Sequence, residues 1–385
     1  MKIKTLPIFM AFLVMGVADA MGPLSDAVKN NYDLSNVMAT MLSFFVFIAF
    51  AAFSVPGGLL AARIGLKKLL LFGLGLNAAA MLVPCIKDPG FTVLLLCIFV
   101  LGVGTTLLQV AGNPIMRDVS AEGAYSRNLS FAQGIKGFGS TAATYLVTAL
   151  ASIAFFSKMG WRAPFPVFFI LMAASFGAVA VIKINEHKPE VPPSVKSSLG
   201  LLKEPIFAMA VLGIFLYVGA EVCMARFLFP ELQKMGLSEQ TAGKFGAALF
   251  FGLLTIGRIA GGAVLLKVKP RPALRVSALM GAVGAALLMS GHANLAIAGV
   301  ILGGLGFANI WPLLFSITVE ERPEHAGELS GLMCMAISGG AIVPLIMGAA
   351  IDNGAGALAF IVPTLCFVYL FVLSMRSAKK LAPVK

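Results

Sequence analysis

The feature that most constrains this chain is the way its charged residues collect on alternate gaps between about a dozen long apolar runs. Apolar residues make up 59% of the chain and charged residues 12%, which excludes an ordinary soluble globular protein. About 20 apolar residues span a bilayer as a helix, and lipid offers no partner to backbone amides left unpaired. The pattern predicts an all-α membrane protein that crosses the bilayer many times.

Twelve apolar runs are long enough to be membrane spans. They are predicted at residues 6–28, 36–62, 67–86, 90–115, 128–155, 163–184, 205–230, 240–266, 271–291, 293–318, 327–351 and 355–375. With the N-terminus inside, and with basic residues near the span ends counted with the adjoining loops, the 29 basic residues divide into 20 in inner segments, 6 in outer segments and 3 within spans. Because Lys and Arg concentrate on the cytosolic side, both termini are predicted to be cytosolic. The expected location is the plasma membrane, which is the inner membrane of a bacterium.

The net charge of +12 follows from the same asymmetry, since the surplus basic residues lie in the orienting loops. Nucleic acid is therefore not an expected partner, whereas membrane lipid is. The five cysteines lie in or beside apolar runs without a short-spaced pair, which predicts buried packing instead of a disulfide framework or a zinc site. The sequence has no catalytic triad, nucleotide loop or metal spacing, so we expect no enzyme, no metal and no cofactor.

The longest polar stretch, residues 185–203, lies at the middle of the chain and contains three prolines. It predicts an N-terminal six-helix bundle at 1–184, a cytosolic linker at 185–203 and a C-terminal six-helix bundle at 204–385. A shift of 203 residues superposes similar positions of the two halves, among them Phe12 on Phe215, Gly16 on Gly219 and Leu34 on Leu237. This organisation resembles the major facilitator transporters. The repeat also disfavours a cleavable signal at the N-terminus, because the first span belongs to it.

Polar residues inside the predicted spans are costly, so each needs a partner or a wet cavity. The fourth span carries Thr105, Gln109 and Asn113 on one helix face, and the fifth carries Gln133 and Lys136 in a similar stripe. Hydroxyls alone are as consistent with helix packing as with a cavity, but amides and a lysine in register favour a wet lining.

The tenth predicted span adds Asn309 and Trp311 just before Pro312. An aromatic ring beside amides suits the apolar face and the hydroxyls of a sugar, although a lone Trp is equally consistent with packing. The candidate substrate-binding residues are therefore Gln109, Asn113, Gln133, Lys136, Asn309 and Trp311.

Two carboxylates lie at corresponding depths of the repeat, Asp19 in the first span and Glu221 in the seventh. Both are candidates for cation coupling; the alternatives are an acid neutralised by Lys136 for Asp19 and an ion pair with Arg226 for Glu221. The candidate gating residues are Arg63, in the loop motif after the second span, and Arg258, which is expected to snorkel or to brace an inner gate.

Several segments resemble the fucose/galactose/glucose symporter family of the major facilitators. They are Leu108–Pro114, Arg127–Gln133, Phe138-Gly139, Tyr217–Val222, Met335–Pro344 and Ile361–Pro363. The resemblance covers both halves and nearly every span. It implies the major facilitator fold, a monosaccharide substrate and a co-transported proton.

The chain departs from this family at four positions. Pro23 and Gln109 stand where the family has its acids in the first and fourth spans, and Ala62 replaces the aspartate of the loop motif after the second span. Lys136 stands where the family usually has an asparagine, which leaves an acidic sugar open. The resemblance therefore implies the fold and a sugar substrate more directly than it implies the proton mechanism.

Three functions are open on the sequence. The first is a symporter, expected to be monomeric, that imports a hexose or deoxyhexose with a proton or sodium ion by alternating access. The second is an exporter or exchanger of an anionic or amphipathic solute that uses Lys136 and Arg226 as counter-charges. The third is a non-transporting sensor or scaffold, which large soluble domains or long tails would favour, and neither is visible in this sequence.

Overall fold

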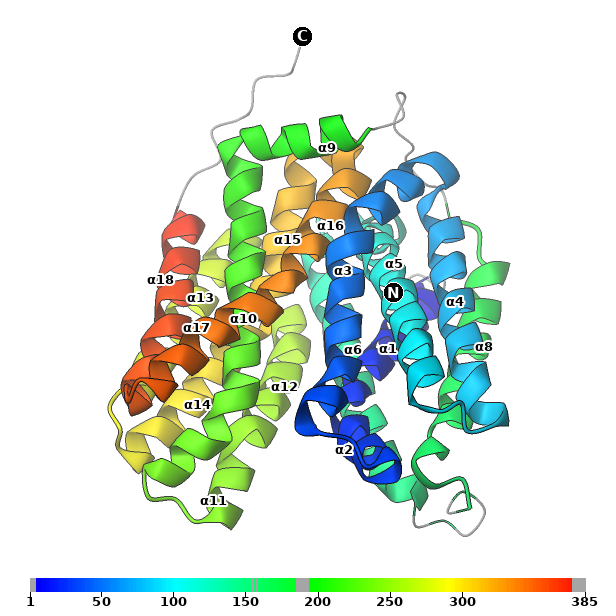
Figure 1. Cartoon of the computed structure of the whole chain (residues 1–385). Helices are drawn as coiled ribbons and strands as arrows, with labels where there is room; N and C mark the ends of the chain where they lie inside the picture. The colour runs from blue at the N-terminus through cyan, green and yellow to red at the C-terminus, as the bar shows by residue number, and fades with distance from the viewer. Residues whose placement is uncertain (1–4, 152, 154–155, 157, 185–193, 376–385) are drawn as a thin grey trace. The chain divides into compact units, whose positions relative to one another are not determined.

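The structure is a computed structural model that describes residues 5–151, 153, 156, 158–184 and 194–375. Within these ranges it describes every side chain except those of residues 19–23, 25, 26, 36, 37, 39, 40, 43, 144, 147, 148 and 151. The chain divides into two compact units (Figure 1). The first consists of residues 1–198 and 322–335, and the second of residues 199–321 and 336–385.

The first unit combines the N-terminal helices with one short segment from the second half of the sequence. These are α1 (Thr5–Met15), the 3₁₀ turn η1 (Gly16–Ala20), α2 (Met21–Tyr32), α3 (Asn36–Ile64), α4 (Leu66–Ile86), α5 (Phe91–Val119), α6 (Tyr125–Ala151), η2 (Gly160–Arg162), α8 (Phe165–Val181), η5 (Pro323–His325) and α16 (Ala326–Met335). The short helix α9 (Val195–Gly200) begins in this unit. Pairs that follow one another in the chain pack together, as α4 does with α5, and α16 packs on α3.

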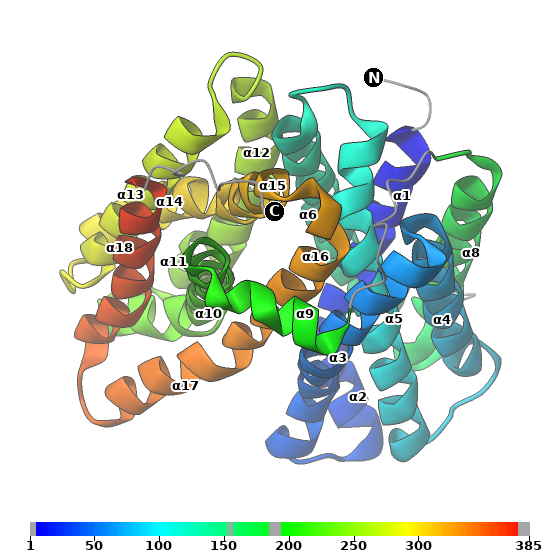
Figure 2. The same cartoon turned by 90° about the horizontal axis from the view of Figure 1, so that it is seen from above.

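The second unit contains the remaining helices. These are η3 (Leu201–Lys203), α10 (Pro205–Lys234), α11 (Glu239–Gly243), the π-helical turn η4 (Lys244–Ala248), α12 (Leu249–Val264), α13 (Pro270–Leu288), α14 (Ala293–Ala308), α15 (Ile310–Glu321), η6 (Ala336–Ser338), α17 (Gly339–Asp352), η7 (Gly356–Phe360) and α18 (Ile361–Met375). Helix α13 packs between α14 and α18, which Figure 2 shows from above.

Ten helical segments of the described chain are long and apolar enough to cross a membrane. They are Phe44–Ile64, Leu66–Ile86, Phe91–Val119, Gly160–Val181, Pro205–Lys234, Glu239–Val264, Pro270–Leu288, Ala293–Glu321, Pro323–Asp352 and Gly356–Met375. The predicted spans 6–28 and 128–155 are absent from this set. The first is interrupted, because α1 ends at Met15 and gives way to a 3₁₀ turn. The second corresponds to α6, which is the helix that carries the polar stripe.

Many large apolar side chains are exposed, while a group of uncharged polar side chains is buried together with the apolar core. Phe72, Ile170 and Leu345 are among the exposed large residues, whereas Gln109 and Asn113 are buried. Exposed apolar surface on this scale requires a solvent that is itself apolar. The structure therefore confirms the predicted all-α membrane protein.

Two pairs of helices cross so closely that only glycine fits at the contact. A Cβ atom on Gly16 would collide with the backbone of α6, and one on Gly139 of α6 would collide with a carbonyl of α1. In the second unit a Cβ on Gly219 of α10 would collide with Val343, and one on Gly339 would collide with a carbonyl of α10. Gly16 and Gly219 are the residues superposed by the predicted repeat. The crossings hold corresponding helices of the two halves in place.

The compact units differ from the predicted bundles at one place. Residues 322–335 lie in the first unit, although the sequence repeat assigns them to the C-terminal half. Helix α16 packs closely against α3 in this unit, because a Cβ on Gly58 of α3 would collide with the carbonyl of Gly327. The division into bundles at 1–184 and 204–385, with a linker at 185–203, stays a prediction about the repeat and its topology.

Candidate functional site

Helix α5 carries the polar stripe of the first unit into its buried core. Thr105, Gln109 and Asn113 are all buried. The side chain of Asn77 in α4 donates to the hydroxyl of Thr105 at 3.1 Å. The four-residue spacing places these groups on one face of the helix, as the sequence predicted.

Asn113 lies at the centre of this group. Its side-chain oxygen accepts from the Gln133 amide of α6 at 3.1 Å, and its backbone carbonyl accepts from the hydroxyl of Tyr125 at 3.0 Å. Its side-chain NH₂ has no hydrogen-bond partner within the described part of the chain. A buried amide with an unpaired N–H costs free energy, so it is a natural donor for a ligand.

A proline opens the backbone of α5 beside Asn113. Pro114 has no N–H to donate to the carbonyl of Val110, which is the acceptor four residues earlier. The hydroxyl of Ser330 in α16 donates to that carbonyl instead, at 2.8 Å. Cys334, one turn further along α16, lies beside Asn113 and within electrostatic reach of Lys136. Lys136 itself is half-buried.

The second unit repeats this backbone defect in its tenth predicted span. That span is broken at Asn309, which separates α14 from α15. Pro312 cannot donate to the carbonyl of Ala308, again four residues earlier. Here the acceptor is taken by the guanidinium of Arg258 in α12, whose Nε donates to it at 3.1 Å.

Arg258 also reaches the seventh predicted span. One of its terminal nitrogens donates to the hydroxyl of Tyr217 at 3.2 Å and lies 3.9 Å from the carboxylate of Glu221. Tyr217 and Glu221 are four residues apart on α10, so they share the face that meets Arg258. Arg258 was expected to snorkel or to brace a gate. The structure buries it and places it beside the buried Tyr217 and the partly buried Glu221. Its role in gating stays a prediction.

Asn309 and Trp311 lie at the break of this span, and both are buried. The Asn309 NH₂ donates to the carbonyl of Gly257 at 2.8 Å, while its oxygen has no partner among the described residues. The indole N–H of Trp311 is likewise without a partner in the described part of the chain. The Trp311 ring packs against Phe315 at 5.9 Å between centroids.

Two of the predicted residues, Arg226 and Arg63, are exposed and do not belong to these buried groups. Glu221 and Arg226 are five residues apart, about 500° around the helix, so they occupy different faces. The guanidinium of Arg226 lies over the ring of Phe227, 5.7 Å from its centroid, and this side chain is exposed. Arg63 is exposed near the end of α3. The side chain of Asp19 lies outside those that the structure describes.

Sequence reasoning missed four residues of these groups: Tyr125, Tyr217, Ser330 and Cys334. Two signals were available. A proline inside a predicted span marks an unpaired carbonyl four residues earlier, and Tyr217 precedes Glu221 by one helical turn. Ser330 and Cys334 carried no such signal, because their approach to α5 depends on tertiary packing alone.

Comparisons with known proteins agree with this architecture. A "Glucose/galactose transporter" of Brucella abortus is 29% identical over 367 residues, which cover 91% of this chain and 88% of that protein. An "L-fucose-proton symporter" of Escherichia coli is 23% identical over 382 residues, covering 89% and 85%. These relatives confirm the resemblance predicted from the sequence.

A solved structure of FucP, described as a Major Facilitator Superfamily transporter in the outward conformation, has the same fold. It superposes with a TM-score of 0.86 at 19% identity, over 97% of this chain and 98% of that one. The sequence profile of the Major Facilitator Superfamily matches residues 8–344. The chain is a multi-pass membrane protein that belongs to the Major Facilitator Superfamily.

Proposed function

We propose that this protein is a secondary transporter of a bacterial inner membrane that imports a monosaccharide together with a cation by alternating access. Relatives named glucose/galactose transporter and L-fucose-proton symporter support a neutral hexose or deoxyhexose as the substrate. The names of these relatives favour a sugar over the alternative of an anionic or amphipathic solute.

The observation that carries the proposal is the buried amide pair of Asn113 and Gln133. The side-chain NH₂ of Asn113 has the weakly accepting thiol of Cys334 beside it and no hydrogen-bond partner among the described residues, so it can donate to a ligand. Amides donate and accept at once, which matches the hydroxyls of a sugar. The second unit offers a comparable set, in the oxygen of Asn309 and the indole N–H of Trp311. Gln109 and Lys136 complete the proposed substrate-binding residues.

Cation coupling is proposed for Asp19 and Glu221, the two carboxylates at corresponding depths of the repeat. Glu221 has a counter-charge in Arg258, so a change in its protonation changes the surroundings of Tyr217 and Ala308 as well. Such a carboxylate can carry a proton or help to coordinate sodium. We propose that the protein does so as a monomer.

The proposed topology has twelve spans with both termini in the cytosol. In it the first span runs through α1, η1 and α2, and α6 is the fifth span. Cysteines introduced at Lys196 and Lys234 test the orientation with an impermeant thiol reagent in intact cells. Labelling is expected at position 234 and not at position 196, and the reverse pattern contradicts the topology.

Uptake by purified protein in proteoliposomes tests the function. Labelled glucose, galactose and fucose are offered separately, with an inward proton gradient or an inward sodium gradient. At least one sugar is expected to accumulate above its external concentration with one of the two gradients, and protein-free liposomes are the control. Failure of all three sugars to accumulate or to exchange contradicts the proposed function.

A further inference from the structure

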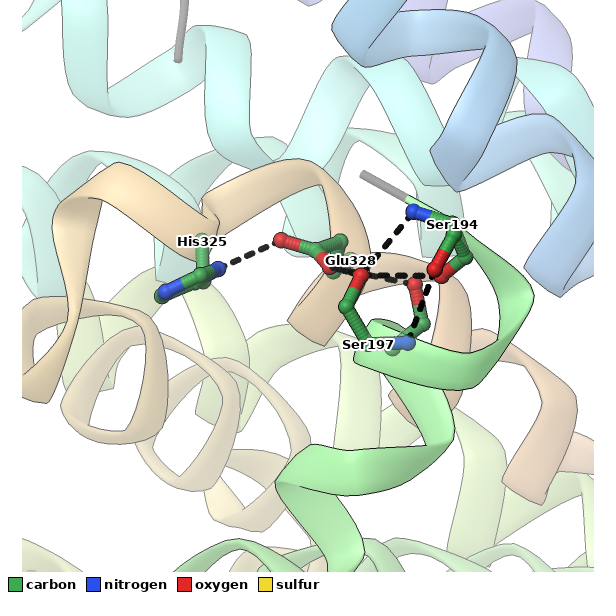
Figure 3. Close-up of polar contacts among 5 residues, drawn as sticks. Ser194, Ser197, His325 and Glu328 are labelled. Atoms are coloured by element: carbon green, nitrogen blue, oxygen red, sulfur yellow. Dashed lines mark hydrogen bonds and ion pairs between the residues drawn. The ribbon is translucent and has the colours of Figure 1, made fainter. Parts of the chain in front are cut away.

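The carboxylate of Glu328, in the first turn of α16, is the centre of a polar cluster outside the sites described above (Figure 3). Its side chain is only 3% exposed. One carboxylate oxygen accepts from the hydroxyls of Ser197 and Ser198 at 3.1 and 3.2 Å, and the other is bonded to the ring nitrogen Nδ1 of His325. A buried carboxylate requires donors of this kind, and here they come from two distant segments.

The serine segment is fixed locally as well. The backbone N–H of Ser197 donates to the hydroxyl of Ser194 at 3.1 Å, and that of Ser194 donates to the hydroxyl of Ser197 at 2.9 Å. These reciprocal bonds cap the start of α9. A terminal nitrogen of Arg117 donates to the carbonyl of Pro323 at 3.5 Å, in the turn that carries His325.

The cluster occupies a distinctive place in the chain. The polypeptide passes from one compact unit to the other after Ser198, after Glu321 and after Met335. Ser197 and Ser198 immediately precede the first of these passages, and His325 and Glu328 follow the second. The carboxylate of Glu328 therefore links the segment before the first passage to the segment after the second passage, although about 130 residues separate the two segments.

Helix α16 leads from this cluster directly to the predicted sugar-binding amide. Two residues after Glu328, Ser330 donates to the carbonyl of Val110. One turn later Cys334 lies beside Asn113. On its other side α16 rests on α3, where a Cβ on Gly331 would lie 2.8 Å from the carbonyl of Ser54. A shift of the first turn of α16 therefore changes the wall around Asn113.

We propose that Glu328 is a positioning residue that clamps α16 to the start of α9, and so sets the wall that Ser330 and Cys334 form beside Asn113. In this role the charge of Glu328 connects the linker segment to the proposed sugar site. This proposal rests on the proposed function in one respect, namely that Asn113 binds the sugar. A residue that merely stabilised the fold would leave the accessibility of Cys334 unchanged in the folded protein.

The reactivity of Cys334 tests the clamp without any sugar. The other four cysteines are replaced, and the rate of alkylation of Cys334 by N-ethylmaleimide is measured on monodisperse protein. Glu328→Ala is expected to accelerate alkylation at least tenfold. Glu328→Gln is expected to accelerate it less, because the amide oxygen of the glutamine still accepts hydrogen bonds from Ser197 and Ser198. The matched control is Glu324→Ala, an exposed glutamate of the adjacent turn, which is expected to alkylate at the wild-type rate.

A second variant keeps the proposal testable if Glu328→Ala does not fold. The double substitution Ser197→Ala with Ser198→Ala removes two donors and leaves the carboxylate with His325, and at least a threefold acceleration is expected. Wild-type alkylation rates in the folded double variant overturn the clamp. In uptake assays the same variant is expected to raise the KM for sugar at least threefold. Faster alkylation with an unchanged KM supports the clamp and contradicts the sugar-binding role of Asn113.

Discussion

In both the fourth and the tenth predicted span, a proline leaves one backbone carbonyl without its helical N–H donor, and a different side chain donates to that carbonyl in each span. In α5, Pro114 leaves the carbonyl of Val110 without its helical donor, and the neutral hydroxyl of Ser330 takes the place. At the junction of α14 and α15, Pro312 leaves the carbonyl of Ala308 without its helical donor, and the charged guanidinium of Arg258 donates to that carbonyl instead. The two breaks share a position in the repeat but differ in the charge of the side chain that contacts the free carbonyl. The break beside Asn113 thus has a neutral donor, whereas the break beside Asn309 has a charged donor that also lies near Glu221.

The largest expected effect follows from removing the charged donor. Arg258→Ala deprives Glu221 of its counter-charge and Ala308 and Tyr217 of their donor, so a loss of about 3 kcal/mol in stability is expected, together with loss of gradient-driven uptake. Thermal unfolding in detergent measures the first quantity. Arg226→Ala is the matched control, because it removes an exposed arginine of the same unit. Equal stability of the two variants contradicts the buried network.

The next effect concerns sugar binding by the neutral half. Asn113→Ala and Gln133→Ala each remove a hydrogen bond to the substrate, and each is expected to weaken binding by about 1 to 3 kcal/mol, or roughly 5- to 150-fold. Binding to purified protein in detergent measures this directly. Ser175→Ala is the control, since Ser175 is also buried and without a partner among the described residues but belongs to α8. Unchanged affinity in both amide variants places the site elsewhere.

The neutral donor is expected to contribute less than the charged one. Ser330→Ala leaves the carbonyl of Val110 without its side-chain donor and is expected to cost about 1 kcal/mol of stability, which is the usual range for a neutral hydrogen bond. The measurement is again thermal unfolding, compared with Arg258→Ala under the same conditions. A loss as large as that of Arg258→Ala shows that charge is not what distinguishes the two halves.

The smallest effect tests the cause of both defects. Pro312→Ala restores an N–H that competes for the carbonyl of Ala308, so Arg258→Ala is expected to cost about 0.5 to 1 kcal/mol less in that background. In a Pro114→Ala background, Ser330→Ala is likewise expected to lower the stability by less than it does in the wild-type protein. A double-mutant cycle for each pair gives the coupling energy. Additive changes in both cycles show that the prolines are not the reason for the side-chain contacts.

Much of this architecture could be predicted from the sequence, because it depends on periodic patterns. Long apolar runs indicated the membrane helices, and the four-residue spacing of Thr105, Gln109 and Asn113 placed them on one buried face. Two spans did not meet the length and hydropathy of the other ten. The first is broken where α1 ends at Met15 and the 3₁₀ turn begins, beside the close crossing at Gly16. The second, α6, carries the polar stripe.

The partners of the buried charges could not be predicted in the same way. The sequence offers Arg226 as one alternative partner for Glu221 because the two are near in sequence. In the structure the counter-charge of Glu221 is Arg258, 37 positions away on another helix. The cluster of Ser197, Ser198 and Glu328 joins segments about 130 residues apart. Contacts of this kind are set by how helices pack, and a pattern along one helix carries no signal of them.

Sugar accumulation and sugar counterflow, measured in the same proteoliposomes, test most directly the claim that carboxylates couple the ion while amides bind the sugar. Asp19→Asn is predicted to abolish accumulation while keeping measurable counterflow, and Glu221→Gln is the parallel test in the charged half. Asn113→Ala is predicted to keep accumulation at saturating sugar and to show only a weakened affinity. Full accumulation by both carboxylate variants would contradict this division of roles between the two kinds of residue.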